Sequence, residues 1–265
     1  MVDVETLVAP LFVPADRPER FAKAADSGAD SVILDLEDAV KPDAKEIARQ
    51  FVTTDFTDLP VLLRINSVAS PWHEADLETA RKGGFAAVIL PKAELPEAVA
   101  RIVKDLSDIP VIALIETAMG LAAAAEIAAS GVCRLAFGSV DYCADLGCQH
   151  QREVLLPARH SLVVASRLGG IAAPLDGVTT DVRSEEAWIS DAEHARAMGM
   201  TGKLCIHPRQ TTGVRQAFLP SAAELDWARR VFSAGTGAVL VDGAMVDAPV
   251  QAYARQLLQR AGELS

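Results

Sequence analysis

Residues 28–35 read GADSVILD, in which a glycine precedes a short apolar run that ends in an acid. The same arrangement recurs before AAVILP at 86–91, CRLAFG at 133–138, IAAPLD at 171–176 and KLCIHP at 203–208. Glycine favours the position just after a helix C-terminus, where φ is often positive, and a short β-branched run is typical of a buried strand. Each repeat therefore predicts the end of a helix followed by a strand.

Three further apolar runs extend the series: LVAPLFVP at 7–14, VLLRIN at 61–66 and VIALIE at 111–116. Helices are predicted between and after these strands, over residues 19–27, 42–52, 71–82, 95–106, 119–129, 153–168, 184–198 and 220–232. Eight such units predict an α/β chain folded as a (β/α)8 TIM barrel. The alternative is an open doubly wound sheet. It should carry a glycine-rich turn after the first strand, but FVPADRP at 12–18 has no glycine.

The composition limits the classes of partner and of protein that the chain can represent. The chain has 265 residues, of which 50% are hydrophobic, and its net charge is −11. That charge argues against nucleic acid or an anionic membrane as a general partner, although a local basic pocket for a phosphorylated ligand is still allowed. No apolar stretch reaches the roughly 20 residues of a membrane helix, and the four cysteines lack metal-ligand spacing. We therefore expect a soluble, cytoplasmic globular protein with free thiols.

The chain is expected to divide into a catalytic barrel over 1–234 and a short C-terminal segment over 235–265. Residues 235–246, GTGAVLVDGAMV, predict a β-ribbon with Asp242-Gly243 as its turn, and residues 250–261 predict a terminal helix. A barrel closes without this segment. It is therefore either a cap at the bottom of the barrel or a lid, the latter able to cover a neighbouring subunit.

Catalytic residues of such barrels lie where strands end, and two acids stand at the ends of neighbouring predicted strands. Glu116 ends VIALIE, and Asp141 follows LAFGSV. Neighbouring strands are about 4.8 Å apart, so both carboxylates can converge on one point. Oxygen ligands without a nearby His or Cys favour Mg²⁺. The alternative is that each acid is the N-cap of the helix that follows it.

Other charged residues also end predicted strands. Arg64, within LLRI, could bind a carboxylate or an enolate oxygen, or it could form a salt bridge with Asp35 or Glu37. The roles of Asp35, Glu37 and Asp38 stay open. Lys92, framed by Pro91 and Glu94, is interpreted as a structural or solvent-facing turn residue, and His207 as an orienting or hydrogen-bonded loop histidine.

Taken together, these residues resemble the citrate lyase β-subunit family, which is grouped with the HpcH/HpaI aldolases. The matching stretches are LFVPADRPERFAKA at 11–24, GADSVILDLEDAV at 28–40, LLRIN at 62–66, ILPKAE at 89–94, IETAMGL at 115–121, FGSVDYCADLG at 137–147, CIHP at 205–208 and GAMVDAP at 243–249. The resemblance implies a (β/α)8 barrel with one Mg²⁺ held by Glu116 and Asp141, and Arg64 at the carbonyl or carboxylate of the substrate.

The resemblance also implies a CoA or acyl-carrier thioester as the substrate, with Arg17 and Lys23 as contacts to its phosphates. Asp247, in GAMVDAP, matches an acid/base residue that relatives close to malyl-CoA lyase carry in a C-terminal lid. In such relatives this residue can reach a neighbouring subunit of a homo-oligomer, a trimer or a hexamer. The implied activity is a carbon–carbon lyase acting on a citryl, malyl or citramalyl thioester. Alternatives are a metal-dependent aldolase on free 2-keto acids, a synthase or thioesterase outcome, and a non-catalytic or complex-bound subunit.

Overall fold

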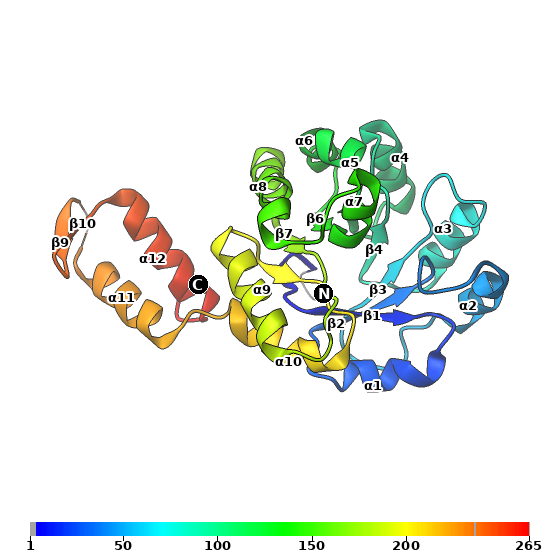
Figure 1. Ribbon diagram of the computed structural model, residues 1–265, viewed down its shortest axis with the longest axis horizontal. Helices are drawn as coiled ribbons and strands as arrows, with labels where there is room; N and C mark the ends of the chain where they lie inside the picture. The colour runs from blue at the N-terminus through cyan, green and yellow to red at the C-terminus, as the bar shows by residue number, and fades with distance from the viewer. Residues whose placement is uncertain (1–3, 236, 265) are drawn as a thin grey trace. The chain divides into compact units, whose positions relative to one another are not determined.

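The computed structural model describes residues 4–235 and 237–264, and its main feature is an eight-stranded parallel sheet whose strands follow sequence order (Figure 1). The strands are β1 Pro10–Pro14, β2 Ser31–Asp35, β3 Val61–Arg64, β4 Ala87–Leu90, β5 Val111–Ile115, β6 Arg134–Phe137, β7 Ala172–Asp176 and β8 Gly202–Lys203. The amide of Phe12 donates to the Cys205 carbonyl at 2.9 Å, and the Cys205 amide to Pro10 at 2.9 Å. These bonds join the two ends of the sheet, so the predicted barrel is confirmed.

The helices of the barrel lie outside the sheet (Figure 1). They are α1 Phe21–Ala25, α2 Lys45–Phe51, α3 His73–Lys82, α4 Pro96–Leu106, α5 Ala118–Ala122, α6 Ala124–Ala128, α7 Ser139–Leu146, α8 Arg152–Gly169, α9 Glu185–Ala197 and α10 Pro208–Phe218. Short 3₁₀ turns precede α1 and α2, over Pro18–Arg20 and Pro42–Ala44, and another spans Val4–Thr6. The predicted helix at 119–129 is two helices, α5 and α6, that meet at Ala123.

The C-terminal part differs from the expected division. Contacts separate two compact units between Arg215 and Gln216, ahead of the expected boundary at residues 234 and 235. The helix predicted at 220–232 does form, as α11 Ala222–Ser233, but it packs against α12 Ala248–Arg260 in the second unit. The last helix of the barrel is instead α10, which the sequence interpretation missed.

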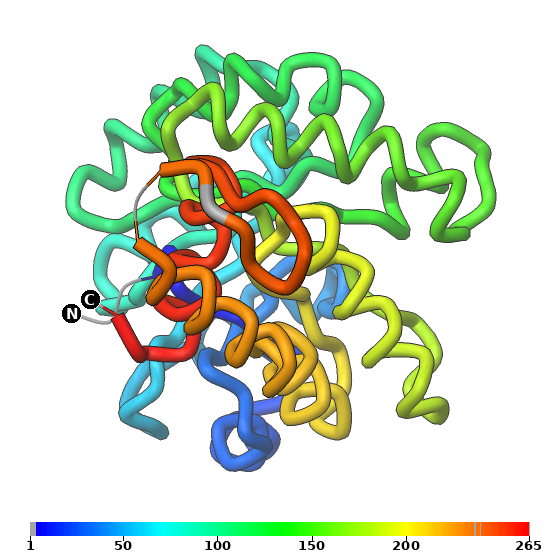
Figure 2. The backbone as a smooth tube through the Cα atoms, turned by 90° about the vertical axis from the view of Figure 1, so that its left-hand side faces the viewer, coloured from blue at the N-terminus to red at the C-terminus, as the bar shows by residue number. Residues whose placement is uncertain are grey.

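The second unit is a helical hairpin with its own core. Helices α11 and α12 lie side by side, and the strands β9 Val239–Val241 and β10 Ala244–Val246, which connect them along the chain, pair with each other (Figure 2). Asp242 and Gly243 form the turn with φ of 51° and 80°, so the predicted ribbon and turn are confirmed. The buried residues of this unit are Ala228, Val231, Val241, Val246, Ala254, Leu257 and Leu258.

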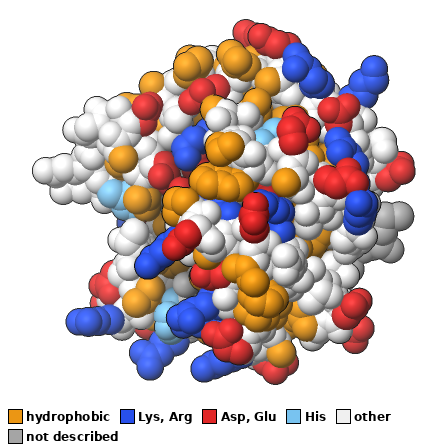
Figure 3. All heavy atoms as spheres, turned by 90° about the vertical axis from the view of Figure 1, so that its right-hand side faces the viewer, with side chains coloured by type: hydrophobic (Ala, Val, Ile, Leu, Met, Phe, Trp, Pro, Cys, Tyr) orange, Lys and Arg blue, Asp and Glu red, His pale blue; other side chains and the backbone are white. Residues whose placement is uncertain are grey.

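Branched aliphatic side chains fill the barrel, since only 5% of the chain is aromatic. Ile33, Leu62, Ile89 and Ile112, one from each of β2 to β5, are fully buried in one cluster. The carboxyl ends of the strands lie on the side toward which β1 runs in Figure 1, and Figure 3 looks onto that side. Acidic and basic side chains adjoin near its centre, with hydrophobic side chains beside them (Figure 3). None of the described helices is long and apolar enough to span a membrane.

Candidate active site

A cavity of about 440 Å³ opens at the carboxyl ends of the strands. Its lining includes the strand-end residues Asp35, Arg64, Glu116 and Asp141. Its apolar wall is formed by Phe12, Leu114, Phe137, Val178, Leu204 and Ile206. A larger cavity of about 700 Å³ lies at the opposite, amino ends of β3 to β6, and its described lining includes no lysine or arginine. The carboxyl-end cavity is therefore the candidate active site, as barrel enzymes require.

Arg64 lines one side of this cavity. Its Nε and Nη2 donate to the two carboxylate oxygens of Asp35 at 2.7 and 2.6 Å, and Nη1 lies 3.1 Å from Glu37 Oε2. Burial alone would lower the pKa of Arg64, but Asp35, Glu37 and Glu116 raise it above its ordinary value. The guanidinium also lies 4.7 Å from the Phe12 ring centroid. The salt-bridge alternative therefore holds, and it orients Arg64 along the cavity wall rather than removing it from the site.

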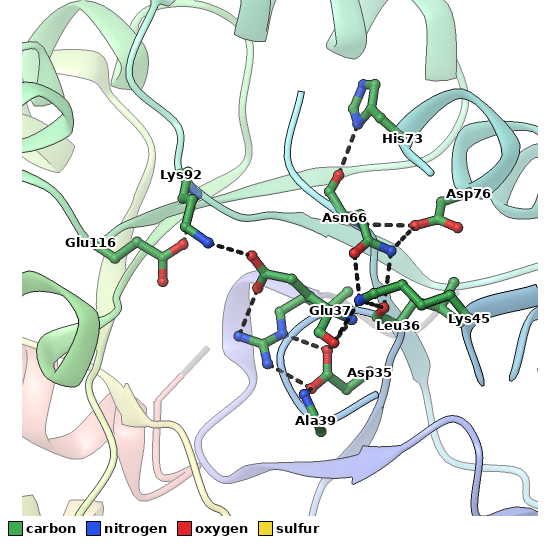
Figure 4. Close-up of polar contacts among 11 residues, drawn as sticks. Asp35, Leu36, Glu37, Ala39, Lys45, Asn66, His73, Asp76, Lys92 and Glu116 are labelled. Atoms are coloured by element: carbon green, nitrogen blue, oxygen red, sulfur yellow. Dashed lines mark hydrogen bonds and ion pairs between the residues drawn. The ribbon is translucent and has the colours of Figure 1, made fainter. Parts of the chain in front are cut away.

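Behind Arg64, the loop after β2 is fixed by a buried lysine. Lys45 Nζ donates to the carbonyls of Leu36 and Glu37 at 2.8 and 2.9 Å, and to Asn66 Oδ1 at 2.7 Å. The Asn66 Nδ2 donates in turn to Asp76 at 2.6 Å (Figure 4). Burial lowers the pKa of Lys45, although nearby carboxylates oppose that shift. These hydrogen bonds fix the backbone of the segment that carries Asp35 and Glu37.

Glu116 follows β5 and presents one unsatisfied oxygen. Its Oε1 accepts a hydrogen bond from the backbone amide of Lys92 at 2.7 Å, while its buried Oε2 has no hydrogen-bond partner. Burial, then the charges of Glu37 and Asp141, raise the pKa of Glu116 to about 8 in the absence of a cation. A buried carboxylate oxygen without a partner is costly, so this atom indicates a ligand that the fold is built to receive.

Asp141 lies in the first turn of α7 and lines the same cavity. Among the described residues its carboxylate has no hydrogen bond or ion pair. Its charge helps to raise the Glu116 pKa, so the two acids are close enough to repel each other. Neither is an N-cap: Thr117 caps α5 and Gly138 precedes α7. The N-cap alternative is therefore wrong for both residues.

These two carboxylates fit Mg²⁺ better than a metal that needs a complete protein cage. In the parts of the chain that are described, no group of three or more His, Cys, Asp or Glu side chains could hold a metal. Mg²⁺ commonly keeps several waters and takes only one or two protein carboxylates. The four cysteines, at 133, 143, 148 and 205, are free thiols.

Four further residues that the sequence singled out are described by their local surroundings. Arg17 and Lys23 are exposed on the β1–α1 connection and on α1, and Arg17 lies 4.0 Å from Glu19. His207 accepts a hydrogen bond at Nδ1 from the Arg209 amide at 3.2 Å, which supports its interpretation as a loop histidine. Asp247 belongs to the second unit, where its carboxylate caps α12 at the Val250 amide. The roles of Arg17, Lys23 and Asp247 stay predictions.

Two contributions to the site were missed from sequence. Gly138 lies against Glu116: a Cβ at this position would lie 2.5 Å from Glu116 Oε2. Lys92 contacts both Glu116 and Glu37, although it was interpreted as a turn residue without a part in the site. Gly138 lies in the motif FGSVD and Lys92 in the motif ILPKAE. The contacts of these two residues with Glu116 depend on how separate strand ends approach one another.

Sequence comparison identifies the group to which this arrangement belongs. The sequence profile described as HpcH/HpaI aldolase/citrate lyase matches residues 9–208, which contain Arg64, Glu116 and Asp141. The chain belongs to this family. As a member, it is a lyase-type enzyme.

Individual relatives support this membership. A citrate lyase subunit beta-like protein of Mycobacterium tuberculosis is 40% identical over 96% of this chain and 95% of the relative. A (3S)-malyl-CoA thioesterase of Cereibacter sphaeroides is 35% identical over 95% of this chain and 93% of the relative. A crystal structure of protein CitE from M. tuberculosis, in complex with magnesium, acetoacetate and coenzyme A, has a TM-score of 0.88 and 39% identity. It covers 98% of this chain and 100% of that one.

Proposed function

We propose that this protein is a Mg²⁺-dependent carbon–carbon lyase of the retro-Claisen type, acting on a 3-hydroxyacyl thioester such as citryl-, malyl- or citramalyl-CoA. The observation that carries the proposal is the buried Glu116 Oε2 without a partner, in the cavity that Asp141 and Arg64 also line. The magnesium and coenzyme A in the M. tuberculosis crystal support both the cation and the thioester.

Glu116 and Asp141 would hold the cation, and each would stay ionised because the cation replaces their mutual repulsion with attraction. Bound Mg²⁺ would supply Lewis-acid polarisation of the 3-hydroxyl and the neighbouring carboxylate of the substrate. Once the hydroxyl proton has passed to solvent, the Cα–Cβ bond breaks and its electron pair stays on the thioester fragment, which yields a 2-keto acid and the enolate of the remaining thioester.

Arg64 stabilises the enolate oxygen in this proposal. Asp35 and Glu37 fix the guanidinium before substrate arrives, so its orientation costs little at the moment of reaction. Asp247 protonates the enolate carbon and so completes an acyl-CoA product. Arg17 and Lys23, both exposed, contact the phosphates of CoA or of an acyl carrier. The second unit acts as a lid in a homo-oligomer, a trimer or a hexamer, in which Asp247 reaches a neighbouring subunit.

A thioesterase outcome is the second candidate, because the C. sphaeroides relative carries that name. Water would attack the thioester carbonyl after or instead of carbon–carbon bond cleavage. The same cavity serves both reactions, and the products distinguish them: cleavage releases a keto acid and leaves the thiol of CoA acylated, whereas hydrolysis releases free thiol.

The direct test incubates the full chain with malyl-, citramalyl- and citryl-CoA and Mg²⁺, and measures free keto acid and free thiol separately. We expect Mg²⁺-dependent keto acid from at least one thioester, abolished by EDTA and restored by Mg²⁺. Free thiol without keto acid would support the thioesterase instead. No product from any of the three would favour a carrier-protein substrate or a complex-bound subunit.

A second test isolates the proposed acid/base residue. Asp247→Asn should block exchange of the acetyl-CoA methyl protons with solvent deuterium, measured by NMR, because no carboxylate would remove the proton. Glu263→Gln, on the same unit but paired to Arg229, is the matched control and should exchange normally. Unchanged exchange in Asp247→Asn would remove this residue from the mechanism.

A further inference from the structure

We propose that Lys92 is a positioning residue for the Glu116 carboxylate, because its left-handed backbone directs an amide to Oε1 and leaves Oε2 free for a cation. Its ammonium group has a second role and balances the charge of Glu37 beside Arg64. This inference rests on the proposed metal role of Glu116. Figure 4 shows Lys92 between the two glutamates.

The backbone of Lys92 adopts a conformation that lysine rarely takes. Its φ is 48°, one of three positive values among the described non-glycine residues. A side chain with a Cβ is disfavoured in this region, so surrounding contacts must hold the residue there. In this conformation the amide donates to Glu116 Oε1 at 2.7 Å.

The contacts that hold this turn come from the neighbouring strand. The Ala93 amide donates to the Leu114 carbonyl at 3.3 Å, which joins the turn after β4 to β5. Gly120, on α5, lies close to the same turn, since a Cβ there would lie 2.6 Å from the Ala93 carbonyl oxygen. The turn is therefore fixed on the element that carries Glu116, and the amide of Lys92 and the carboxylate are positioned as one unit.

The Lys92 ammonium group is the second cation beside the Glu37 carboxylate. Lys92 Nζ lies 3.0 Å from Glu37 Oε1, while Arg64 lies 3.1 Å from Glu37 Oε2. Glu37 is buried, and among the described residues Lys92 and Arg64 are the cations within ion-pair distance of its carboxylate, so the loss of Lys92 would leave it with one such partner, Arg64. Arg64 would then have less positive charge to offer an enolate. The two roles of Lys92 use different atoms and can be separated by substitution.

The first experiment compares Lys92→Gly, Lys92→Asn and Lys92→Val. All three lack the ammonium, but glycine and asparagine tolerate positive φ whereas valine does not. The affinity for Mn²⁺ is measured by electron paramagnetic resonance on the purified chain, without substrate. We expect glycine and asparagine to bind within about threefold of the wild type, and valine to bind about 10- to 100-fold more weakly, the range for residues that orient a ligand.

Equal affinities in all three variants, whether unchanged or equally weakened, would overturn the backbone role. If Lys92→Val fails to fold, Lys92→Ala provides the intermediate case, because alanine disfavours positive φ without β-branching. Absence of Mn²⁺ binding by the wild type would instead contradict the proposed function itself, so the two failures are distinguishable.

The second experiment tests the ammonium group through kinetics. Lys92→Met should lower kcat about tenfold with little change in KM, and Lys92→Arg should recover most of kcat because it restores a cation beside Glu37. A merely structural role would reduce both variants alike. An Arg variant as slow as the Met variant, or a Met variant with unchanged kcat, would overturn the ammonium role.

Discussion

At the ends of β2 and β3, Asp35 and Arg64 share two hydrogen bonds, whereas Glu116 at the end of β5 keeps a buried oxygen without a partner. We call Asp35, Glu37 and Arg64 the paired side of the cavity, and Glu116 and Asp141 the unpaired side. Both sides concentrate charge in one cavity, but only the paired side is electrostatically complete without a ligand. Substitutions on the paired side should therefore cost stability in addition to the proposed catalytic role of Arg64, whereas substitutions on the unpaired side should cost mainly function.

The largest effect is expected for Arg64→Met on the paired side. This variant leaves Asp35 and Glu37 buried with only partial compensation from Lys92. The free energy of unfolding, measured by urea titration at pH 7, should fall by about 3–5 kcal/mol. Lowering the pH toward 5 should recover part of this loss, because burial raises the pKa of Glu37 and its protonation removes one unpaired charge. A loss below about 1 kcal/mol would show that the paired side is not held together as described.

Glu116→Gln tests the opposite side, and its effect should appear in function instead. The amide can still accept the Lys92 hydrogen bond, so stability should stay within about 0.5 kcal/mol of the wild type or rise. Mg²⁺-dependent cleavage should fall by about 10²–10³-fold, since polarisation by the cation is worth several kcal/mol. Full activity of this variant in EDTA would remove the cation from the unpaired side.

Gly138→Ala tests the unpaired side without changing any charge. The added methyl group would lie 2.5 Å from Glu116 Oε2, so the carboxylate must move or rotate. We expect Mn²⁺ affinity to fall by about 10- to 100-fold, measured by electron paramagnetic resonance.

The matched control for that measurement is Gly213→Ala on α10, where a Cβ would meet Trp188 rather than the cavity. It should bind Mn²⁺ like the wild type. Equal Mn²⁺ affinity in the two variants would show that the Glu116 carboxylate can move away from a methyl group at position 138 without losing the cation.

The sequence predicted the charged residues at the strand ends, but not the contacts that position them. Strand ends are local features, so Arg64, Glu116 and Asp141 could be found by noting which charges follow apolar runs. The left-handed turn at Lys92 and the close approach of Gly138 to Glu116 could not, because both depend on where β4, β5 and β6 end relative to one another. Only the three-dimensional register of separate strands gives these contacts.

The same limit applies to the fold. Eight strands follow from repeated glycine and β-branched runs, which are local signals. Helix α10 was missed because Thr211, Thr212 and Gly213 have poor helix propensity and are held by tertiary contacts. Helix α11 was predicted at 220–232, and in the structure Ser221 and Glu224 form a capping box at its start. A cap specifies where a helix starts and not which unit it joins, so α11 was attached to the barrel in error.

The last expected effect concerns pH, is at most about 1.4 kcal/mol per pH unit, and distinguishes the two sides in the wild type itself. Without a cation the pKa of Glu116 is about 8 in the folded chain, above its ordinary value of 4.5, so the folded state binds more protons between these values. Stability of the metal-free chain should therefore fall as pH rises from about 5 to 8, by at most about 1.4 kcal/mol per pH unit. Thermal unfolding across this range measures the slope.

Glu116→Gln should flatten it, and saturating Mg²⁺ should do the same in the wild type because the bound cation keeps the carboxylate ionised. A slope that persists in Glu116→Gln would assign the titration to the paired side, where burial also raises the pKa of Glu37.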